Sequence, residues 1–362
     1  MNDNKNRINN RLSKLRKLMV QKGMDAVLVT KRENYMYLSG FTGTSAYLVI
    51  TQDSAVLMTD FRYIEQAAKQ APMYEVVKYQ GSFVQALGEL LKSRGIGRLG
   101  FEDNYLTYER YAEFEQKLGM QELIPLKGII ENLRMIKDAD EIEIIKKAVK
   151  ISDDAFTHIL SFIKPGTSET EIAAELEYFM KKQGASKEAF DTIVASGERS
   201  SLPHGVASEK RLEAGDAITL DFGAIYMGYC SDMTRTVFLG KPCKELEKIY
   251  EIVLEAQSAA LEGAHKGMSG KAVDLIARDI ITKAGFGDYF GHGLGHGVGI
   301  EIHEEPRFSP SGNTVIEDGM IITVEPGIYV PGLGGVRIED MIVINGDNPI
   351  DITGATKKML VL

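Results

Sequence analysis

The chain is organised around the stretch GHGLGHGVGIEIHE, residues 291–304, which contains three of its six histidines. Glycine occupies every odd position from 291 to 299. Because each glycine costs a helix about 1 kcal/mol relative to alanine, the segment is expected to be extended or looped, with its backbone close to a neighbour. His292 and His296 would then lie about 13 Å apart, whereas a metal–nitrogen bond measures about 2 Å. The sequence therefore predicts that at most one of them binds a given metal ion.

Length and composition describe an ordinary globular chain. Its 362 residues predict two domains, and its net charge of −9 argues against a nucleic-acid partner, which would need a broad basic face. The two cysteines indicate no disulfide framework. The N-terminus lacks an apolar signal core, and no apolar run approaches the ~20 residues that cross a bilayer. We therefore expect no membrane association and a cytoplasmic location.

The pattern of residues 1–130 predicts an α/β domain that carries no catalytic motif. Apolar and amphipathic segments alternate there, with no phosphate loop and no G-x-G-x-x-G pattern, so we expect a scaffold, a cover or a dimer contact. The expected helices are 8–23, 60–70, 83–94 and 108–118, and the expected strands are 26–30, 46–51, 55–59, 74–79 and 98–102. Asp138 and Glu141 then form a capping-box pattern that opens a new helix, and the second domain is expected to span residues 131–362.

Two aspartates are expected on one face of a hairpin formed by residues 216–226 and 229–238. A two-residue turn at Met227 and Gly228 places Asp221 opposite Thr234. Asp232 is then the diagonal neighbour of Asp221 on the same face, within roughly 7–8 Å. Aspartate is depleted in strands, and two aspartates that point the same way repel unless cations or protons neutralise them. The alternative is that both lie at an exposed strand edge.

A second pair of expected strands, 320–327 and 335–344, repeats this design with Glu325 and Glu339. Glutamate is also uncommon inside strands. Earlier in the chain, His204 lies between a proline and a glycine on an expected loop. It has no helix or strand to pack into, so it either faces a site or lies on the surface.

Five side chains form the candidate ligand set: Asp221, Asp232, His296, Glu325 and Glu339. The four carboxylates and one imidazole suit Mn²⁺, Co²⁺, Fe²⁺ or Zn²⁺ better than a closed thiolate zinc site would. Two such ions about 3.5–4 Å apart can share a bridging hydroxide and polarise a carbonyl. The predicted reaction is therefore metal-assisted hydrolysis.

Short motifs around these residues carry a family resemblance. They are TLDFG at 219–223, SDMTRT at 231–236, HGLGHGVG at 292–299, IHE at 302–304, TVEPG at 323–327 and VRIED at 336–340. With the order Asp, Asp, His, Glu and Glu, they resemble the creatinase/aminopeptidase P/prolidase/methionine aminopeptidase family of metallopeptidases (M24). The likeness is strong from about residue 130 to 362 and looser before it. It implies an α/β (α+β) fold, with a smaller N-terminal creatinase-type α/β domain followed by a catalytic domain of the pita-bread fold.

The resemblance implies a role for each ligand of a two-metal centre. Asp221 would chelate one divalent ion, and Asp232 and Glu339 would bridge both. His296 and Glu325 would complete the second ion. The metals implied are two Mn²⁺ ions, with Co²⁺, Zn²⁺ or Fe²⁺ as alternatives that the ligand types leave open.

Further roles are implied for residues around the metals. Glu325 would also move a proton between the attacking water and the leaving nitrogen. His204, His292 and His303 resemble active-site histidines that contact substrate, orient its proline and stabilise the oxyanion. Arg337 would bind substrate or hold a ligand carboxylate in place, or it would only balance charge.

The implied activity is that of an Xaa-Pro peptidase, either a dipeptidase or an aminopeptidase, acting on peptides with proline at the second position. The resemblance also implies a homodimer. Methionine aminopeptidase activity is a second reading, although those enzymes usually lack such an N-terminal domain. A non-catalytic peptide-binding module is a third, but it should have lost ligands, and all five are present.

Overall fold

The computed structural model of the protein describes residues 2–362 and, within its first helix, the side chains from Lys5 onward. The chain divides into two compact units, an N-terminal unit that ends at Arg134 and a C-terminal unit that spans Met135–Leu362. The sequence predicted a boundary between residues 130 and 131, a position that falls inside helix α6 (Ile129–Met135). No helix among the described residues is long and apolar enough to span a bilayer.

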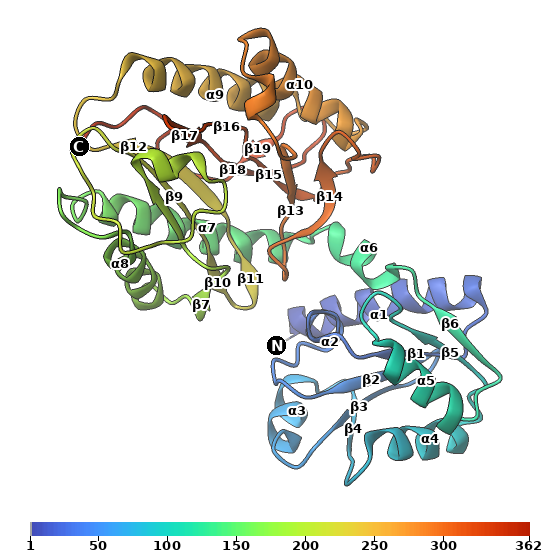
Figure 1. Cartoon of the computed structure of the whole chain (residues 1–362). Coiled ribbons are helices and arrows are strands. Elements are labelled where there is room, and N and C mark those ends of the chain that lie inside the picture. The colour runs from blue at the N-terminus through green and yellow to red at the C-terminus, as the bar shows by residue number, and fades with distance from the viewer. Residues whose placement is uncertain (1) are drawn as a thin grey trace. The chain divides into compact units, whose positions relative to one another are not determined.

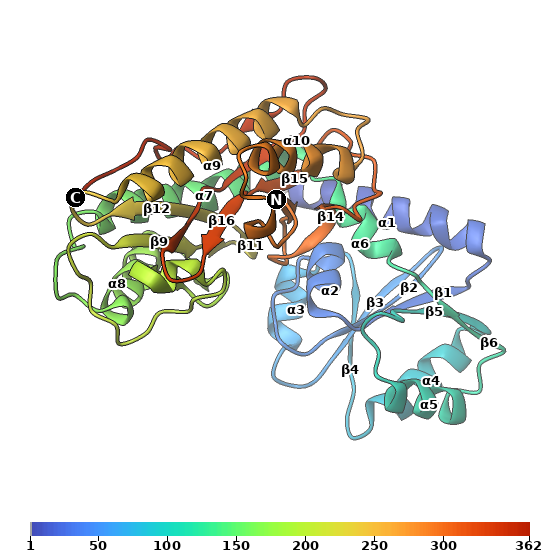
Figure 2. The ribbon, with the colours of Figure 1, turned by 45° about the horizontal axis from the view of Figure 1, so that its top comes forward.

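The N-terminal unit is built on a six-stranded mixed sheet in the order β4-β3-β2-β1-β5-β6. The strands are β1 (Ala26–Val29), β2 (Tyr47–Thr51), β3 (Ala55–Thr59), β4 (Glu75–Lys78), β5 (Arg98–Phe101) and β6 (Glu122–Pro125). The other helices are α1 (Asn2–Lys22), α2 (Arg32–Ser39), α3 (Ile64–Gln70), α4 (Phe83–Ser93) and α5 (Tyr108–Lys117). Apolar side chains of the sheet pack against α4 and α5, which lie side by side in Figure 2.

Three details of this unit differ from the prediction. Helix α3 begins at Ile64 rather than near 60, because the Asp60 carboxylate accepts hydrogen bonds from the backbone and side chain of Arg62 and holds these residues in a turn. Helix α2 and strand β6 were not predicted. Helix α2 has no capping side chain at its start, and β6 ends in a proline, so neither carries the usual sequence signal of a helix start or a strand.

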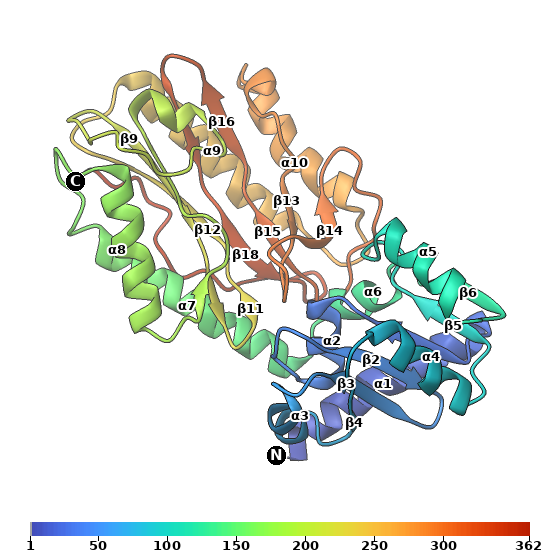
Figure 3. The same cartoon turned by 60° about the horizontal axis from the view of Figure 1, so that its bottom comes forward.

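The C-terminal unit sandwiches its strands between two pairs of helices (Figures 1 and 3). The helices are α7 (Ala139–Ile159), α8 (Glu169–Lys182), α9 (Lys244–Gly263) and α10 (Gly270–Lys283). Helices α7 and α8 share one apolar cluster with the first strands of the unit, and α9 and α10 share another with the last strands. The capping box predicted at Asp138 and Glu141 is present and opens α7.

The strands of this unit form several small antiparallel sheets. The sheet beside α7 and α8 has the order β12-β9-β8, and a five-stranded sheet has the order β14-β13-β15-β18-β19. The first group of strands is β7 (Lys187–Glu188), β8 (Ile193–Ser196), β9 (Ala217–Phe222), β10 (Ala224–Tyr226), β11 (Tyr229–Cys230) and β12 (Met233–Phe238). The second group is β13 (Gly295–Gly297), β14 (Glu304–Phe308), β15 (Ile321–Val324), β16 (Gly327–Val330), β17 (Gly334–Arg337), β18 (Asp340–Val343) and β19 (Ile350–Asp351).

The pairing of both predicted strand pairs is confirmed. In the first, Asp221 on β9 pairs with Thr234 on β12. In the second, Ile322 pairs with Ile342 and Ile328 with Val336 in one continuous register, but the expectation that its glutamates lie inside the paired strands is wrong. Strand β15 pairs with β18 and β16 pairs with β17, and Glu325 and Glu339 each fall in the break between two paired segments. Pro326 contributes to the break, since proline has no N–H to donate to a ladder.

Candidate metal centre

The glycine-rich stretch forms a strand that lies close to its neighbours. Strand β13 runs between β14 and β15, and the segment contains no helix, as predicted. A Cβ atom at Gly295 would lie 1.9 Å from the carbonyl oxygen of Thr323, and one at Gly297 would lie 2.3 Å from that of Glu305. These contacts leave no room for a larger residue, so the glycines let β13 carry His296 deep between two strands.

A cavity of about 510 Å³ in the C-terminal unit collects all of the predicted site residues. Its volume is ordinary for a small-molecule site. The predicted residues in its lining are His204, Asp221, Asp232, His292, His296, His303, Glu325, Arg337 and Glu339. They come from segments more than a hundred positions apart, which the antiparallel sheets bring together.

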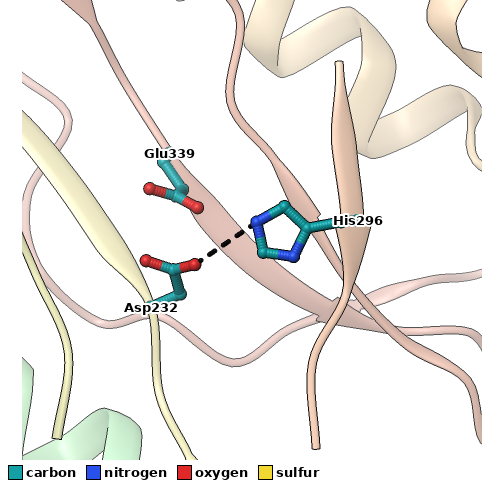
Figure 4. A group of neighbouring side chains, drawn as sticks. All are labelled: Asp232, His296 and Glu339. Carbon is teal, nitrogen blue, oxygen red and sulfur yellow. Dashed lines mark ion pairs between the residues drawn. The ribbon is translucent and has the colours of Figure 1, made fainter. Parts of the chain in front are cut away.

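Asp232, His296 and Glu339 form the tightest group. They offer ligand atoms that all lie within 4.8 Å of one another, and Figure 4 shows the two carboxylates and the imidazole converging on one space. The Nε2 atom of His296 lies 3.5 Å from Asp232 Oδ2 and 3.4 Å from Glu325 Oε1. All three members of the group are buried.

The buried carboxylates raise one another's pKa. Burial, followed by repulsion from Glu339 and Asp221, raises the pKa of Asp232 well above its usual value. Burial and the charges of Glu325 and Asp221 do the same to the pKa of Glu339. Burial also raises the pKa of Glu325 to about 7. A cluster of this kind is costly unless protons or cations neutralise it.

His296 is held as a neutral imidazole with a free lone pair. Burial lowers its pKa to about 3, with His303 adding to the effect. Its Nδ1 atom lies 3.1 Å from the carbonyl oxygen of Gly297, and since a carbonyl only accepts, Nδ1 carries the proton. The Nε2 lone pair therefore faces the carboxylate oxygens of Asp232 and Glu325.

Two observations show that this donor set fits divalent cations. The Nε2 lone pair of His296 and the carboxylate oxygens around it are all acceptors, and only a cation or extra protons between them can make the arrangement favourable. Among residues 2–362, Oε1 of Glu339 is a buried oxygen without a hydrogen-bond partner. Buried oxygens are rarely left in that state, and the site of a positive ion explains the exception.

Arg337 connects the carboxylates to each other. Its guanidinium donates from Nη2 to Asp221 Oδ2 at 2.6 Å and from Nε to Thr234 Oγ1 at 3.0 Å. The Thr234 hydroxyl in turn donates to Glu339 Oε2 at 2.7 Å. A third donation runs from Nη1 to the hydroxyl of Tyr329 at 2.7 Å. Three sides of one planar group are thus used, which a single ammonium could not reproduce.

A second arginine fixes the strand that follows Glu339. The buried Arg235 donates from Nη1 to the backbone oxygens of Thr234 and Glu339 and from Nη2 to Asp340 Oδ1, the last at 2.6 Å. Gln257 and Lys357 also donate to Asp340. Strands β12 and β18 are therefore tied together beside the candidate ligands, which limits how far Glu339 can move.

The other histidines have separate surroundings. The Tyr329 hydroxyl lies 3.0 Å from His292 Nε2, while Nδ1 of the same ring faces the Gly293 carbonyl oxygen at 2.8 Å. Burial, with Arg337 second, lowers the pKa of His292 to about 4, so the ring is neutral and accepts from the tyrosine. His303 is exposed, and its ring lies edge-on to that of His296 with centroids 4.3 Å apart. His204 is exposed at the cavity on its loop.

The sequence analysis missed several residues of the cavity. Tyr329 is buried between Arg337 and His292, and Arg307 presents a half-buried guanidinium. The cavity also has an apolar wall, formed by Phe190, Ile193, Pro203, Val206 and Ile302. No motif marks these residues. The strand pairings that bring them together become visible only in the folded chain.

Fold and donor set together define a metal-dependent hydrolase with a separate N-terminal domain. The chain belongs to metallopeptidase family M24, whose model matches residues 143–346. The model of the creatinase/prolidase N-terminal domain matches residues 11–136. The family and the two-domain α/β fold predicted from the sequence are thereby confirmed.

Individual relatives match over nearly the whole chain. An Xaa-Pro dipeptidase of Pyrococcus furiosus is 45% identical over 352 residues, 97% of this chain and 99% of the relative. The structure of an Xaa-Pro dipeptidase from Bacillus anthracis has 49% identity and a TM-score of 0.96, covering 98% of this chain and 100% of the other. The prolidase of Pyrococcus horikoshii has 43% identity and a TM-score of 0.92, with coverage of 97% and 100%.

Proposed function

We propose that the protein is a two-metal Xaa-Pro dipeptidase, which hydrolyses the bond between an N-terminal residue and a C-terminal proline. The observation that carries this proposal is one cavity in which four acids and a neutral imidazole meet an apolar wall and an arginine. The full-length similarity to proteins named Xaa-Pro dipeptidase supports it.

The candidate ligands divide between two divalent ions, for which Mn²⁺ is our first choice. Asp221 would hold one ion, Asp232 and Glu339 would be shared by both, and His296 and Glu325 would hold the other. When bound, the ions would acidify a water molecule and polarise the scissile carbonyl.

The carboxyl group of Glu325 is suited to move the proton. Its carboxylate lines the cavity beside Nε2 of His296, and the Thr323 hydroxyl orients its Oε1 with a hydrogen bond of 3.1 Å. As in the hydrolysis of any peptide bond, the leaving nitrogen, here that of proline, must gain a proton to depart as an amine. Glu325 takes that proton from the attacking water and delivers it to the proline nitrogen.

The rest of the cavity binds the two ends of a dipeptide. The apolar wall accepts the proline ring, which offers no N–H to recognise. Within residues 2–362 the Arg307 guanidinium makes no hydrogen bond or ion pair, although it lines the cavity, so it is available for the carboxylate of the substrate. The histidines His204, His292 and His303 surround the peptide. Both ring nitrogens of His292 are engaged by Gly293 and Tyr329, so His204 and His303 are the two that stabilise the negative oxygen that forms on its carbonyl.

The activity test compares Ala-Pro, its amide Ala-Pro-NH₂ and the tripeptide Ala-Pro-Ala while Mn²⁺ is titrated in. We expect the free dipeptide to be turned over best, because only it presents a carboxylate directly on proline. Arg307→Ala should raise KM for Ala-Pro at least about 10-fold and leave KM for the amide unchanged, since a hydrogen bond to a charged group contributes about 1.5–3 kcal/mol.

The remaining readings are outcomes of the same assay once Met-Ala peptides are added to the substrates. Faster cleavage of Ala-Pro-Ala than of Ala-Pro would make the protein an aminopeptidase. Cleavage of Met-Ala peptides alone would make it a methionine aminopeptidase. Absence of turnover on every peptide by metal-loaded protein would leave a peptide-binding module.

Ion binding is also expected to change stability and its dependence on pH. The folded, ion-free protein keeps protons on Asp232, Glu339 and Glu325 to a higher pH than the unfolded chain does. Folding therefore takes up protons, and the free energy of unfolding falls as the pH rises from about 5 to about 8.

Saturating Mn²⁺ should reverse this trend, because the ligands bind as carboxylates. At 100 times its Kd the ion adds about 2.7 kcal/mol. Thermal melts of EDTA-stripped protein at several pH values, with and without Mn²⁺, measure both effects. Identical melting curves with and without the ion would rule out a preformed site.

A further inference from the structure

The loop that presents His204 has no regular structure at that residue. It follows the short 3₁₀ helix η1 (Gly197–Ser201) and lies ahead of strand β9. Within residues 2–362 the His204 ring makes no hydrogen bond. Its place at the cavity therefore depends on how the backbone on either side is held.

One buried carboxylate holds both ends of this loop. Glu169, the first residue of α8, has a side chain without exposed surface. Its Oε1 accepts from the backbone N–H and the hydroxyl of Ser196, both at 2.8 Å. Its Oε2 accepts from the backbone N–H of Ser208 at 3.1 Å and from its hydroxyl at 2.6 Å. The loop from Ser196 to Ser208 is thus closed on a single side chain.

The same carboxylate also holds the middle of the loop through an arginine. Arg199 Nε lies 3.1 Å from Glu169 Oε2, and Nη2 of the same guanidinium donates to the carbonyl oxygen of Val206 at 2.8 Å. On the other side of His204, the carbonyl oxygen of Pro203 accepts from Arg337 Nη1 at 3.3 Å. His204 is therefore flanked by one backbone contact that depends on Glu169 and another that depends on Arg337.

We propose that Glu169 is a positioning residue for His204. It fixes the loop so that the exposed imidazole stands at the cavity, and it does so without touching substrate or metal. This inference rests on the proposed function, in which His204 contacts the peptide. It assigns α8, an element outside the cavity, a part in substrate turnover.

Glu169→Gln is the sharpest change, because it keeps the shape of the side chain and alters only its hydrogen bonding. Both carboxylate oxygens accept from a backbone N–H, at Ser196 and Ser208. In glutamine, one of the two oxygens is replaced by an NH₂ group, which is a donor. That group would face the N–H and hydroxyl donors of Ser196 or Ser208 without an acceptor, and buried donors left unpaired are costly. One end of the loop is released.

A double-mutant cycle on kcat/KM for Ala-Pro separates positioning from general stability. Glu169→Gln is expected to lower kcat/KM about 10²-fold, because a displacement of about 1 Å in a group that contacts substrate has an effect of that size in other enzymes. The affinity for Mn²⁺ should not change. In the background of His204→Ala it should change kcat/KM less than about 2-fold, because residues that act through one another are not additive. Losses that multiply would overturn the proposal.

A second readout does not depend on activity. The six histidines give separate Cε1–Hε1 cross-peaks in an NMR spectrum of the ion-free full chain, and the spectrum of His204→Ala assigns the one of interest. Glu169→Gln should shift that peak towards the position of free histidine. An unmoved peak would overturn the proposal even if the protein were inactive on every Xaa-Pro peptide, and a moved peak would support it in that case.

The matched control lies two residues further along the same helix. Glu171 is exposed and closes the capping box of α8 with Ser168, and glutamine serves that box as well as glutamate. Glu171→Gln should leave kcat/KM and the His204 peak unchanged. If Glu169→Gln does not fold, Ser208→Ala takes its place in the same cycle and spectrum, with the same outcomes deciding. It removes the 2.6 Å contact to Glu169 and the 3.2 Å hydrogen bond that the same hydroxyl accepts from the Lys210 N–H.

Discussion

Replacing Asp232 with alanine is expected to lower kcat/KM for Ala-Pro at least about 10³-fold at saturating Mn²⁺, a loss of about 4 kcal/mol of transition-state stabilisation. Asp232 is buried within 4.8 Å of the ligand atoms of both His296 and Glu339, so its loss removes an acceptor that no neighbour can replace. Steady-state kinetics on metal-loaded protein, with the metal content measured alongside, checks the effect. Turnover near that of the parent would mean that the ligand assignment is wrong.

The same substitution should have the opposite effect on stability when no ion is present. Burial raises the pKa of Asp232 well above its usual value, and the charges of Glu339, Asp221 and Glu325 raise it further. Alanine removes one member of that cluster, so the ion-free variant should melt at a higher temperature than the ion-free parent at pH 8, and Mn²⁺ should stabilise it less.

Asp347→Ala is the matched control for that measurement. Asp347 is exposed on the loop that follows β18 and does not line the cavity, so its removal should change neither melting temperature nor turnover. If ion-free Asp232→Ala melts below the parent, the carboxylates are not repelling one another, and another cation within the fold must already balance them.

The chemistry of the candidate site could be recognised in the sequence because its residues break local rules. Acids inside strands and histidines between glycines are costly choices that a stable fold avoids, so Asp221, Asp232 and His296 stood out before any contact was known. The pairing of Asp221 with Thr234 followed from a two-residue turn at Met227 and Gly228 and is what the structure has. The structure places these residues at one cavity.

Long-range geometry could not be read in this way. The break of the last strands at Glu325 depends on how β15 leaves its sheet, which no local pattern encodes. Tyr329 and Arg307 are ordinary residues in strands, and their positions at the cavity result from neighbours far away in the chain. Glu169 is the extreme case, since a glutamate in the first turn of a helix is ordinary and only the folded loop shows what it holds.

Arg337 is the residue whose replacement should have the second largest effect. Its guanidinium donates to Asp221, Tyr329 and, through Nε, Thr234, and it is buried. Removing it as Arg337→Met should lower kcat/KM for Ala-Pro about 10²-fold, the upper end of the range for groups that orient metal ligands. Mn²⁺ affinity, measured by calorimetry, should fall as well. The control is Arg110→Met at an exposed arginine, which should change neither kcat/KM for Ala-Pro nor Mn²⁺ affinity.

Arg337→Lys decides between charge balance and ligand orientation, two of the roles that the sequence left open for this residue. If Arg337 only balances the charge of the carboxylates, lysine restores most of the lost activity, because its ammonium carries the same charge. If it orients Asp221, lysine fails, because one ammonium cannot donate along the three directions that the guanidinium uses. The hydroxyl of Thr234, which links the guanidinium to Glu339, would then lose its donor too. We expect Arg337→Lys to behave like Arg337→Met, within about 3-fold in kcat/KM, and recovery of activity by lysine would assign the residue to charge balance.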